Sequence, residues 1–318
     1  MRVCSHPTRR EIMAGSLAAA LATSVAGVPS IAHAAGGDGV HKLALGDLQI
    51  TILSDGVLNV PTRLLNRDMN SATIEAALGE AGSASGQVQY GVNIVLVRSG
   101  SELVLIDAGA GGTWEPTAGK LADRLATAGI DPGTITKVVI THGHPDHLWG
   151  LVDEFDDSPR FANAQHIMPA PELDYWRKVS VETLPERTQG VAAGAKRVIA
   201  TVGERLAAAA PDAEILPGIA FLATPGHTPG HCSVRISGGA HGLIVTADTL
   251  FHPHVSFAYP EWQPAADMDG AQAVASRRRL LDMAAADGLQ LASYHLPFPG
   301  LGRVERRGAA YRWLSARA

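Results

Sequence analysis

The sequence predicts a layered α/β fold in which short apolar strands are covered by amphipathic helices. Two observations support this prediction. Groups of apolar runs followed by helical stretches occur twice along the chain, and neither an internal repeat nor a linker-like stretch divides residues 40–318, so we expect one domain there. The composition, 46% hydrophobic and 18% charged, is ordinary for a globular protein and excludes a disordered or coiled-coil chain.

The predicted strands are short and largely apolar. Residues 43–60 alternate apolar and polar side chains and contain Asp55-Gly56, a pair that predicts a turn between strands. Residues 92–98 and 103–106 are expected to form a hairpin across a Ser-Gly-Ser turn. The remaining expected strands are buried runs at 138–140, 218–222, 243–245 and 289–292.

Four stretches between these strands have the pattern of helices. They cover about 118–129, 171–179, 188–210 and 269–287. The last begins beside Asp267 and Asp269 and ends at Gly288, which are the residue types typical of helix starts and stops.

The first 34 residues have the pattern of an export signal rather than of a folded segment. Arg9 and Arg10 precede a weakly apolar run from Ile12 to Val28, and Ala32-His33-Ala34 matches a cleavage site. Paired arginines before such a run resemble a twin-arginine signal. We therefore expect the folded domain to cover 35–318 and to be located in the periplasm or secreted after cleavage near Ala34. The alternative is an N-terminal membrane anchor, but the run is short and poorly apolar for a stable one.

Charge and cysteine content exclude several classes of protein. The formal net charge is −5, so no basic surface indicates nucleic-acid binding and no nucleic-acid partner is expected. The two cysteines, Cys4 and Cys232, exclude a disulfide framework and a cysteine-rich zinc module. The 13 histidines therefore direct any metal chemistry towards imidazole and carboxylate ligands.

Potential metal ligands occur where the predicted strands stop. T-H-G-H-P-D-H (141–147) and T-P-G-H-T-P-G-H (224–231) each follow an apolar run, as do Asp248 and His295. Strand ends in an α/β sheet meet at one edge, where ligand sites form. The alternative is that these are ordinary core and surface histidines, which holds better for one isolated histidine than for this set.

The set is large enough for two divalent ions. It holds five imidazoles and two carboxylates: His142, His144, His147, His227, His295, Asp146 and Asp248. Gly143 permits a tight loop that brings the two flanking rings to one ion, and a carboxylate can bridge two ions about 3.5–4 Å apart. Such ligands suit zinc, iron, cobalt or manganese, and the absence of thiolates disfavours a purely structural zinc.

These motifs resemble those of the metallo-β-lactamase superfamily. H-G-H-P-D-H, G-H-T-P-G-H, the isolated Asp248 and His295, and I-D-A-G at 106–109 are the matching features. Within the superfamily the chain is most similar to the methyl parathion hydrolases, at segments 107–117, 141–151, 224–231 and 295–302. The likeness spans 43–318 and implies an αββα sandwich of two mixed β-sheets flanked by helices, a dimetal site at one edge, and possible homodimers.

By position, the resemblance implies two groups of ligands that share one bridging carboxylate, Asp248. One metal is held by His142, His144 and His227, and the other by Asp146, His147 and His295. Asp107 is expected to orient a ligand histidine through its distal nitrogen, whereas His231 has no ligand role and is expected to be structural. Two zinc ions per chain are expected, with iron, cobalt or manganese as alternatives.

The implied activity is metal-assisted hydrolysis, with Asp146 and Asp248 in the catalytic centre. Hydroxide between the ions attacks while one ion polarises the substrate oxygen. The resemblance implies an exported enzyme cleaving neutral esters of the organophosphate triester type. Two alternatives remain: a lactonase or arylesterase, for example for N-acyl homoserine lactones, and a non-catalytic periplasmic metal-binding protein.

Substrate choice is expected to depend on aromatic side chains near the ligands. Trp114 and Trp176 resemble aromatic positions at the methyl parathion hydrolase entrance, and Phe251 follows Asp248 closely; core packing is the alternative for all three. Bacillus-type lactonases carry a tyrosine at the place of Phe251, so a lactonase here lacks that donor. No arginine cluster indicates an anionic substrate, which favours a small neutral ester or lactone.

Overall fold

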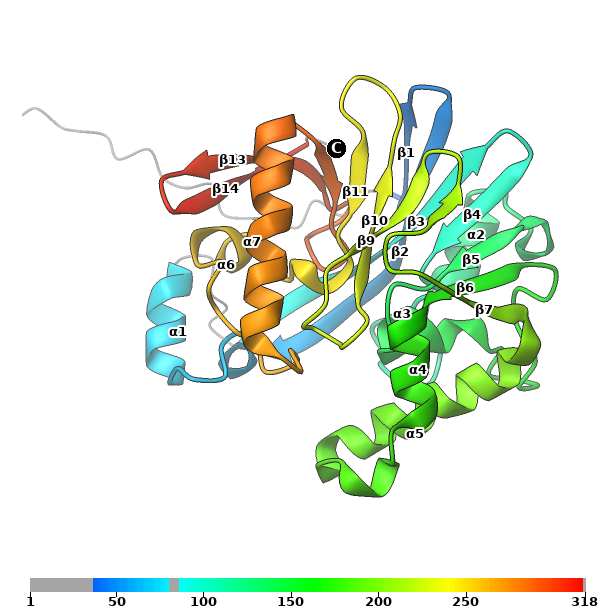
Figure 1. Cartoon of the computed structure of the whole chain (residues 1–318), viewed down its shortest axis with the longest axis horizontal. Helices are drawn as coiled ribbons and strands as arrows, with labels where there is room; N and C mark the ends of the chain where they lie inside the picture. Colours follow the sequence, from blue (N-terminus) through cyan, green and yellow to red (C-terminus); the bar gives the residue numbers. More distant parts are fainter. Residues whose placement is uncertain (1–36, 80–85, 317–318) are drawn as a thin grey trace, which may run out of the picture. The chain divides into compact units, whose positions relative to one another are not determined.

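The computed structural model describes residues 37–79 and 86–316 (Figure 1). The expected signal peptide, residues 1–34, lies outside this described part. Within it, fourteen strands form two seven-stranded sheets.

The first sheet contains the strands of the N-terminal half of the described chain, in sequence order. Strands β1 to β4 pair antiparallel, and β4 to β7 pair parallel. The strands are β1 (Val40–Leu45), β2 (Leu48–Pro61), β3 (Gln87–Ser99), β4 (Glu102–Ile106), β5 (Lys137–Val139), β6 (Gln165–Pro169) and β7 (Leu206–Ala209).

The second sheet is built from the C-terminal half, again in sequence order. All its neighbours pair antiparallel except β11 and β12, which are parallel. The strands are β8 (Glu214–Leu216), β9 (Ile219–Ala223), β10 (Cys232–Ile236), β11 (Leu243–Val245), β12 (Gln290–Ala292), β13 (Leu301–Arg307) and β14 (Ala310–Ser315).

The two sheets pack face to face and helices cover their outer faces. Ile52 and Val97 of the first sheet share one buried apolar cluster with Phe221 and Val234 of the second. Separate clusters join the first sheet to α2, α4 and α5, and the second sheet to α7. The helices are α1 (Ser71–Leu78), α2 (Leu121–Thr127), α3 (Pro145–Leu148), α4 (Ala170–Lys178), α5 (Glu186–Val202), α6 (Val255–Ala258) and α7 (Gly270–Asp287).

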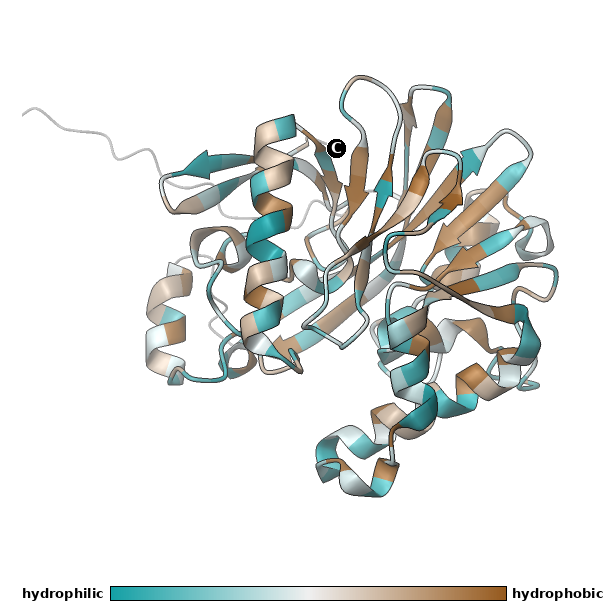
Figure 2. Cartoon of the chain, viewed as in Figure 1, coloured by the Kyte–Doolittle hydropathy of each residue, from teal (hydrophilic) through white to brown (hydrophobic). Residues whose placement is uncertain are grey.

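This arrangement confirms the expected αββα sandwich with two mixed sheets. Figure 2 shows the matching distribution of hydropathy: the central strands are mostly brown, and the helices carry both brown and teal residues. Burial of one apolar stripe per helix against a sheet is what holds the four layers together.

Two local predictions were wrong. Asp55-Gly56 does not form a turn: it is a bulge inside β2, and a Cβ on Gly56 would lie 2.2 Å from the carbonyl oxygen of Thr117. The turn lies at Gly46, whose φ is +62°. The helix expected at 188–210 ends at Val202, because Gly203 takes a φ of +62° and the chain then enters β7.

Other expected elements are confirmed, with shifted ends. The hairpin of β3 and β4 forms, and β3 is longer than expected. Helix α7 begins at the predicted cap, where the Asp269 side chain accepts a hydrogen bond from the backbone N–H of Gln272, and it ends at Gly288 in the left-handed region. Strands β6, β8, β10, β13 and β14 were not predicted from the sequence. The turn between β13 and β14 lies at Gly308, whose φ is +62°.

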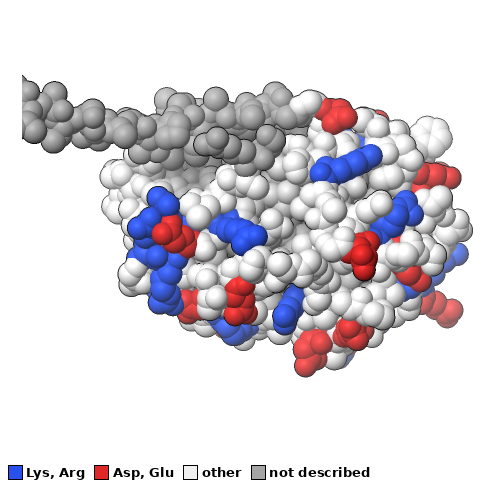
Figure 3. All heavy atoms as spheres, turned by 90° about the horizontal axis from the view of Figure 1, so that it is seen from above, with Lys and Arg blue, Asp and Glu red and all other residues white. Residues whose placement is uncertain are grey.

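Surface charges are mixed in sign. In Figure 3 basic and acidic side chains are interspersed over the visible face. Near the C-terminal strands the arginines form ion pairs with carboxylates, as Arg307 and Arg312 do with Glu305. Of the helices in the described part of the chain, none combines the length and the apolar character that a membrane crossing requires.

A buried histidine in β6 predicts a pH dependence of stability. Neither ring nitrogen of His166 has a hydrogen-bond partner in the described segments, and burial lowers its pKa to about 4 from 6.5. Between pH 6.5 and pH 4 the unfolded chain therefore binds a proton at His166 more readily than the folded chain does. The free energy of unfolding accordingly falls as the pH falls through this range. From pH 7 to pH 5 the wild type should lose about 2 kcal/mol more than His166→Leu in urea unfolding.

The matched control is His241→Leu, because His241 is exposed. That variant should keep the wild-type dependence of stability on pH. Parallel stability curves for the wild type and His166→Leu would contradict the assignment.

Candidate metal centre

Residues at the ends of strands from both sheets meet in one buried cluster. Asp107 directly follows β4, and His142 to His147 lie in the loop and short helix α3 after β5. His227 lies between β9 and β10, Asp248 follows β11, and His295 follows β12. The structure thus brings together all seven predicted ligands, which are buried except for the half-buried His144.

The first group contains His142, His144, His227 and Asp248. The His144 Nδ1 lies 3.1 Å from His142 Nε2 and 2.8 Å from His227 Nε2. The His227 Nε2 lies 3.1 Å from Asp248 Oδ2. Ligands about 2.0–2.1 Å from a tetrahedral zinc are about 3.3 Å from one another, so this spacing fits one ion.

The second group contains Asp146, His147 and His295. The Asp146 Oδ2 lies 3.4 Å from His147 Nε2 and 3.5 Å from His295 Nε2. Asp248 reaches this group as well, with Oδ1 2.9 Å from His147 and Oδ2 3.2 Å from His295. Its carboxylate therefore lies between the two groups, where a bridging ligand would be.

Hydrogen bonds on the outer side fix how three of the rings face inward. The Nδ1 of His295 lies 2.9 Å from the Gly91 carbonyl oxygen, to which it must donate. The Nδ1 of His147 pairs with Asp107 at 2.8 Å, and that of His227 pairs with Asp267 at 2.9 Å. With the proton on Nδ1, each ring presents the lone pair of Nε2 to the cluster.

The cluster is chemically complete only with cations in it. Inward-facing imidazole lone pairs and two carboxylates are all acceptors, so nothing in the set donates to them. Two of these atoms, His147 Nε2 and Asp248 Oδ1, are buried and have no hydrogen-bond partner among the residues described. Buried polar atoms are rarely left so, and two divalent ions would satisfy them.

The position of Asp248 is fixed from behind by His231. The Nδ1 of His231 lies 2.9 Å from the Thr224 carbonyl oxygen, and its Nε2 accepts the backbone N–H of Asp248 at 3.1 Å. Ala247, just before Asp248, has a φ of +45°, an uncommon value for alanine. Burial raises the pKa of Asp248, whereas positive charge on the side of His295, His147 and His227 lowers it well below its usual value.

A carboxylate that the sequence analysis missed, Glu172 of α4, joins the two histidine loops. It is fully buried and accepts four hydrogen bonds. From the first loop it accepts the backbone N–H of Gly143 at 2.9 Å. From the second it accepts the Thr228 hydroxyl and the Gly230 N–H, both at 2.8 Å. The fourth donor is the Trp176 indole at 2.6 Å. Burial raises the pKa of Glu172, and these donors oppose that rise.

Two more carboxylates support the centre without being among the predicted ligands. Asp267, expected only as a helix-start signal, holds His227 and pairs with the buried Arg277 at 3.4 Å. Asp55 of β2 accepts backbone N–H groups from Ala110 and Leu121, which anchors the loop that follows Asp107. Their partners are distant in the sequence, so no local pattern indicates them.

The three predicted substrate-binding aromatics lie in different environments. Trp176 is only 1% exposed, its ring is 6.0 Å from that of His144, and a Cβ on Gly143 would lie 2.2 Å from its indole nitrogen. Phe251 is 4% exposed, with the Arg277 guanidinium 5.0 Å from its ring centre. Trp114 is half-buried at the edge of the core.

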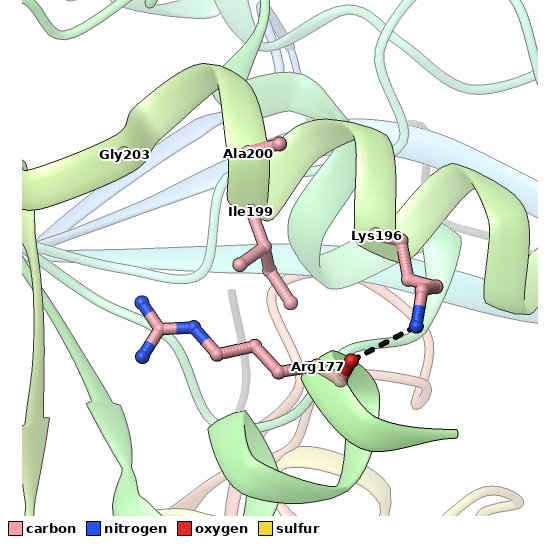
Figure 4. A pocket seen from close by; sticks show the side chains of 5 residues that line it. All are labelled: Arg177, Lys196, Ile199, Ala200 and Gly203. Carbon is pink, nitrogen blue, oxygen red and sulfur yellow. Dashed lines mark hydrogen bonds between the residues drawn. The ribbon is translucent and has the colours of Figure 1, made fainter. Parts of the chain in front are cut away.

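Cys232 and a separate cavity play no part in the cluster. Burial raises the pKa of the Cys232 thiol to about 12, so it is a poor nucleophile, as expected from the sequence. A cavity of about 260 Å³ is lined by Arg177, Lys196, Ile199, Ala200 and Gly203. The Lys196 ammonium donates to the Arg177 carbonyl oxygen (Figure 4). None of the seven clustered residues lines this cavity.

A family model described as the metallo-beta-lactamase superfamily matches residues 88–292. The chain belongs to this superfamily. The match spans well over half of the sequence and includes β4 to β12. Six of the seven clustered residues lie within it, and His295 lies three residues beyond its end.

Solved structures similar to this superfamily member include two at 28% identity. One is "AidC, a Dizinc Quorum-Quenching Lactonase", in complex with a product; its TM-score is 0.83, and the alignment covers 88% of this chain and 98% of that one. The other is the hydrolase AbOPH of the beta lactamase superfamily, with a TM-score of 0.81 and the same coverage.

Curated relatives are more distant and only partly covered. Metallo-beta-lactamase domain-containing protein 1 of Xenopus laevis is 28% identical over 60% of this chain and 66% of its own length. The N-acyl homoserine lactonase of Bacillus cereus is 25% identical over 51% of this chain and 57% of its own length. The chain therefore spans about three-fifths of these relatives. Together with the two ligand groups, the comparisons confirm the expected class, a metal-dependent hydrolase.

The hydrogen bonds of Glu172 predict a selective effect on one ion. In Glu172→Gln an amide NH2 replaces an acceptor oxygen and faces N–H donors, which should destabilise the fold by about 2–3 kcal/mol. The disturbed loops carry His142, His144 and His227, so the first ion should bind roughly tenfold to a hundredfold more weakly. Chelator competition should show one weakened site and one nearly unchanged site per chain.

Asp174→Asn on the same helix is the matched control, because Asp174 is exposed and pairs only with Lys178. It should leave both metal affinities and the urea midpoint unchanged. If Glu172→Gln also binds both ions as the wild type does, Glu172 does not position the histidine loops.

Proposed function

We propose that this protein is a dinuclear-metal hydrolase of uncharged esters, and that its preferred substrates are lactones of the N-acyl homoserine type. One observation carries the proposal. The seven converging acceptors lie on a fold that aligns with 98% of a dizinc lactonase at a TM-score of 0.83. The recurrence of N-acyl homoserine lactonases among the curated relatives supports the same substrate class.

The charge around the centre supports an uncharged substrate. Among the contacts recorded for the seven clustered residues, the charged partners are carboxylates and imidazoles rather than lysine or arginine. The nearby Arg277 is buried and already donates to Asp267 and to the carbonyl oxygens of Thr249, Pro260 and Trp262. Among the described residues, a phosphate monoester would therefore find no unpaired lysine or arginine side chain at the centre.

Two divalent ions, proposed to be zinc, supply an activated water and a Lewis acid when bound. The protein's own residues hold the geometry. Asp248 joins the two groups, while Asp107 and Asp267 orient His147 and His227 through their outer nitrogens. Because the cluster is mostly buried, its electrostatic interactions are weakly screened.

The aromatic residues divide by exposure. Trp114 retains exposed surface, and we propose that it contacts the substrate. Trp176 and Phe251 expose little surface, so we propose that they act through packing: Trp176 beneath the first histidine loop, and Phe251 beside Arg277.

A phosphotriester is the second candidate substrate. The segments at 107–117 and 295–302 resemble those of methyl parathion hydrolases, and a neutral triester satisfies the same charge argument. A purely metal-binding role is disfavoured, because a site that had lost catalysis would be expected to have lost some of its ligands as well.

A substrate panel tests the proposal. Metal-reconstituted protein is assayed with N-hexanoyl homoserine lactone, a simple aliphatic lactone, p-nitrophenyl acetate, methyl parathion and paraoxon, and its metal content is measured. We expect about two ions per chain and a kcat/KM for the acyl homoserine lactone at least tenfold above that for either phosphotriester. The opposite order would establish the second candidate, and turnover of none of the five would refute the proposed function.

The bridging position of Asp248 predicts that its loss harms both ions. Asp248→Ala should lower kcat more than His144→Ala does, by a hundredfold or more, and should abolish occupancy of the second ion. Asp282→Asn, on the surface of α7, is the control and should behave as the wild type. Two bound ions with near-normal rates in Asp248→Ala would show that the carboxylate does not bridge.

The exposure of Trp114 predicts an effect on binding rather than on chemistry. Trp114→Ala should raise KM for bulky aryl esters by roughly tenfold, raise it less for a small lactone, and leave kcat and metal content nearly unchanged. The control is Trp313→Ala, which removes a tryptophan of the C-terminal hairpin that packs against Phe257 of α6. Equal losses on both substrates, or loss of metal, would place Trp114 in the core instead.

We also propose export through the twin-arginine route, with a mature domain at 35–318. This rests on the sequence of residues 1–34. That route carries folded proteins, so the ions can bind before export. Arg9→Lys with Arg10→Lys should keep the precursor inside the cell, as fractionation and immunoblotting would show. Normal delivery of this double variant would contradict the twin-arginine assignment.

A further inference from the structure

A tyrosine that the sequence analysis did not single out lies beside the metal centre. Tyr90 of β3 is 9% exposed, and its ring centre is 5.2 Å from that of His295 and 6.3 Å from that of Phe251. Its hydroxyl makes no hydrogen bond to any residue in the segments that the structure describes. Although the ring is buried, the hydroxyl oxygen is not fully enclosed, so an entering molecule can reach it.

A second tyrosine at the same centre shows the contrast. Tyr294 stacks on His147 with ring centres 3.9 Å apart, and its hydroxyl donates to the Asp146 carbonyl oxygen at 2.6 Å. The donor of Tyr294 is thus used to hold a ligand loop in place. The donor of Tyr90 remains available for a molecule that enters the site.

The backbone fixes the position of Tyr90 relative to the ligands. The next residue, Gly91, donates its N–H to the His295 carbonyl oxygen at 3.0 Å and accepts the His295 Nδ1–H at 2.9 Å. These two bonds tie β3 to the loop after β12. A Cβ on Gly91 would lie 2.4 Å from the Leu296 carbonyl oxygen, so this close approach requires glycine.

The ring contacts place Tyr90 on the Asp248 side of the centre. The His295 ring, whose centre is 5.2 Å from that of Tyr90, has its Nε2 3.2 Å from Asp248 Oδ2. Phe251, the other ring neighbour, follows Asp248 by three residues. Asp248 is the carboxylate between the two ligand groups. A phenol carries its proton at neutral pH, so this hydroxyl can donate a hydrogen bond to a molecule bound there.

We propose that the Tyr90 hydroxyl donates a hydrogen bond to the carbonyl oxygen of the bound ester. When the water oxygen bonds to the carbonyl carbon, the π electron pair of the C=O bond moves to the carbonyl oxygen. The Tyr90 hydroxyl stabilises the negative charge that grows on the carbonyl oxygen. The ester C–O bond then breaks. One water proton ends on the leaving oxygen as a hydroxyl group, and the other is released from the acid product. Tyr90 itself transfers no proton.

This assignment rests on the proposed ester hydrolysis and deepens it. It supplies from β3 a phenol donor at a centre where Phe251 offers none. A fixed donor aimed at a developing oxyanion contributes chiefly to the transition state, so its removal should lower kcat more than it changes KM.

The test is Tyr90→Phe, which removes only the hydroxyl and keeps the ring against His295. On each panel ester that the wild type cleaves, kcat should fall roughly tenfold to a hundredfold while KM changes less than threefold. Metal content and melting temperature should match the wild type. Tyr311→Phe, which removes a phenol bonded to Asp282 on the surface of α7, is the control and should retain full kcat.

The outcomes separate the two claims. Unchanged kcat in Tyr90→Phe would refute the role of Tyr90 and leave the proposed function intact. A loss of kcat accompanied by loss of metal or of thermal stability would make Tyr90 a support for His295 and likewise overturn the assignment. If the wild type cleaves no ester of the panel, both claims fail together.

Discussion

The four hydrogen bonds accepted by Glu172 are the constraint on which much of the metal centre depends. The two loops that carry His142, His144 and His227 leave different sheets and have no strand pairing with each other. One buried carboxylate from α4 fills all its acceptor positions with donors from both loops and from Trp176. Its charge is stabilised by those donors, and in return the loops are held at the separation that one ion requires.

The same principle is repeated around the cluster with other partners. Asp107, Asp267 and the Gly91 carbonyl each hold the outer nitrogen of a histidine, and His231 holds the backbone of Asp248. These outer contacts therefore direct the inner lone pairs towards the two ligand positions. Such preorganisation reduces the conformational entropy lost when metal binds, and it keeps the rings in the tautomer that can bind metal.

Much of the centre could be predicted from the sequence, because its ligands sit in short motifs at strand ends. Their supports could not. Glu172 lies 56 residues from Thr228, and Asp267 lies 40 residues from His227, so only the fold brings them into contact. The apolar runs predict the layers. The Leu-Ala-Ala-Ala sequence of β7 instead predicts helix, because these residues favour helix and only pairing with β6 makes them a strand.

The ligands come from both sheets, and this has a consequence for folding. His142 and His147 follow a strand of the first sheet, whereas His227, Asp248 and His295 follow strands of the second. Ions bound here would cross-link the two sheets. They would lie at the edge where the imidazole nitrogens and carboxylate oxygens of both sheets meet and otherwise repel one another. Metal binding is then coupled to global stability: free metal at a thousandfold excess over its dissociation constant adds about 4 kcal/mol. Chelation should accordingly loosen the whole sandwich along with the site.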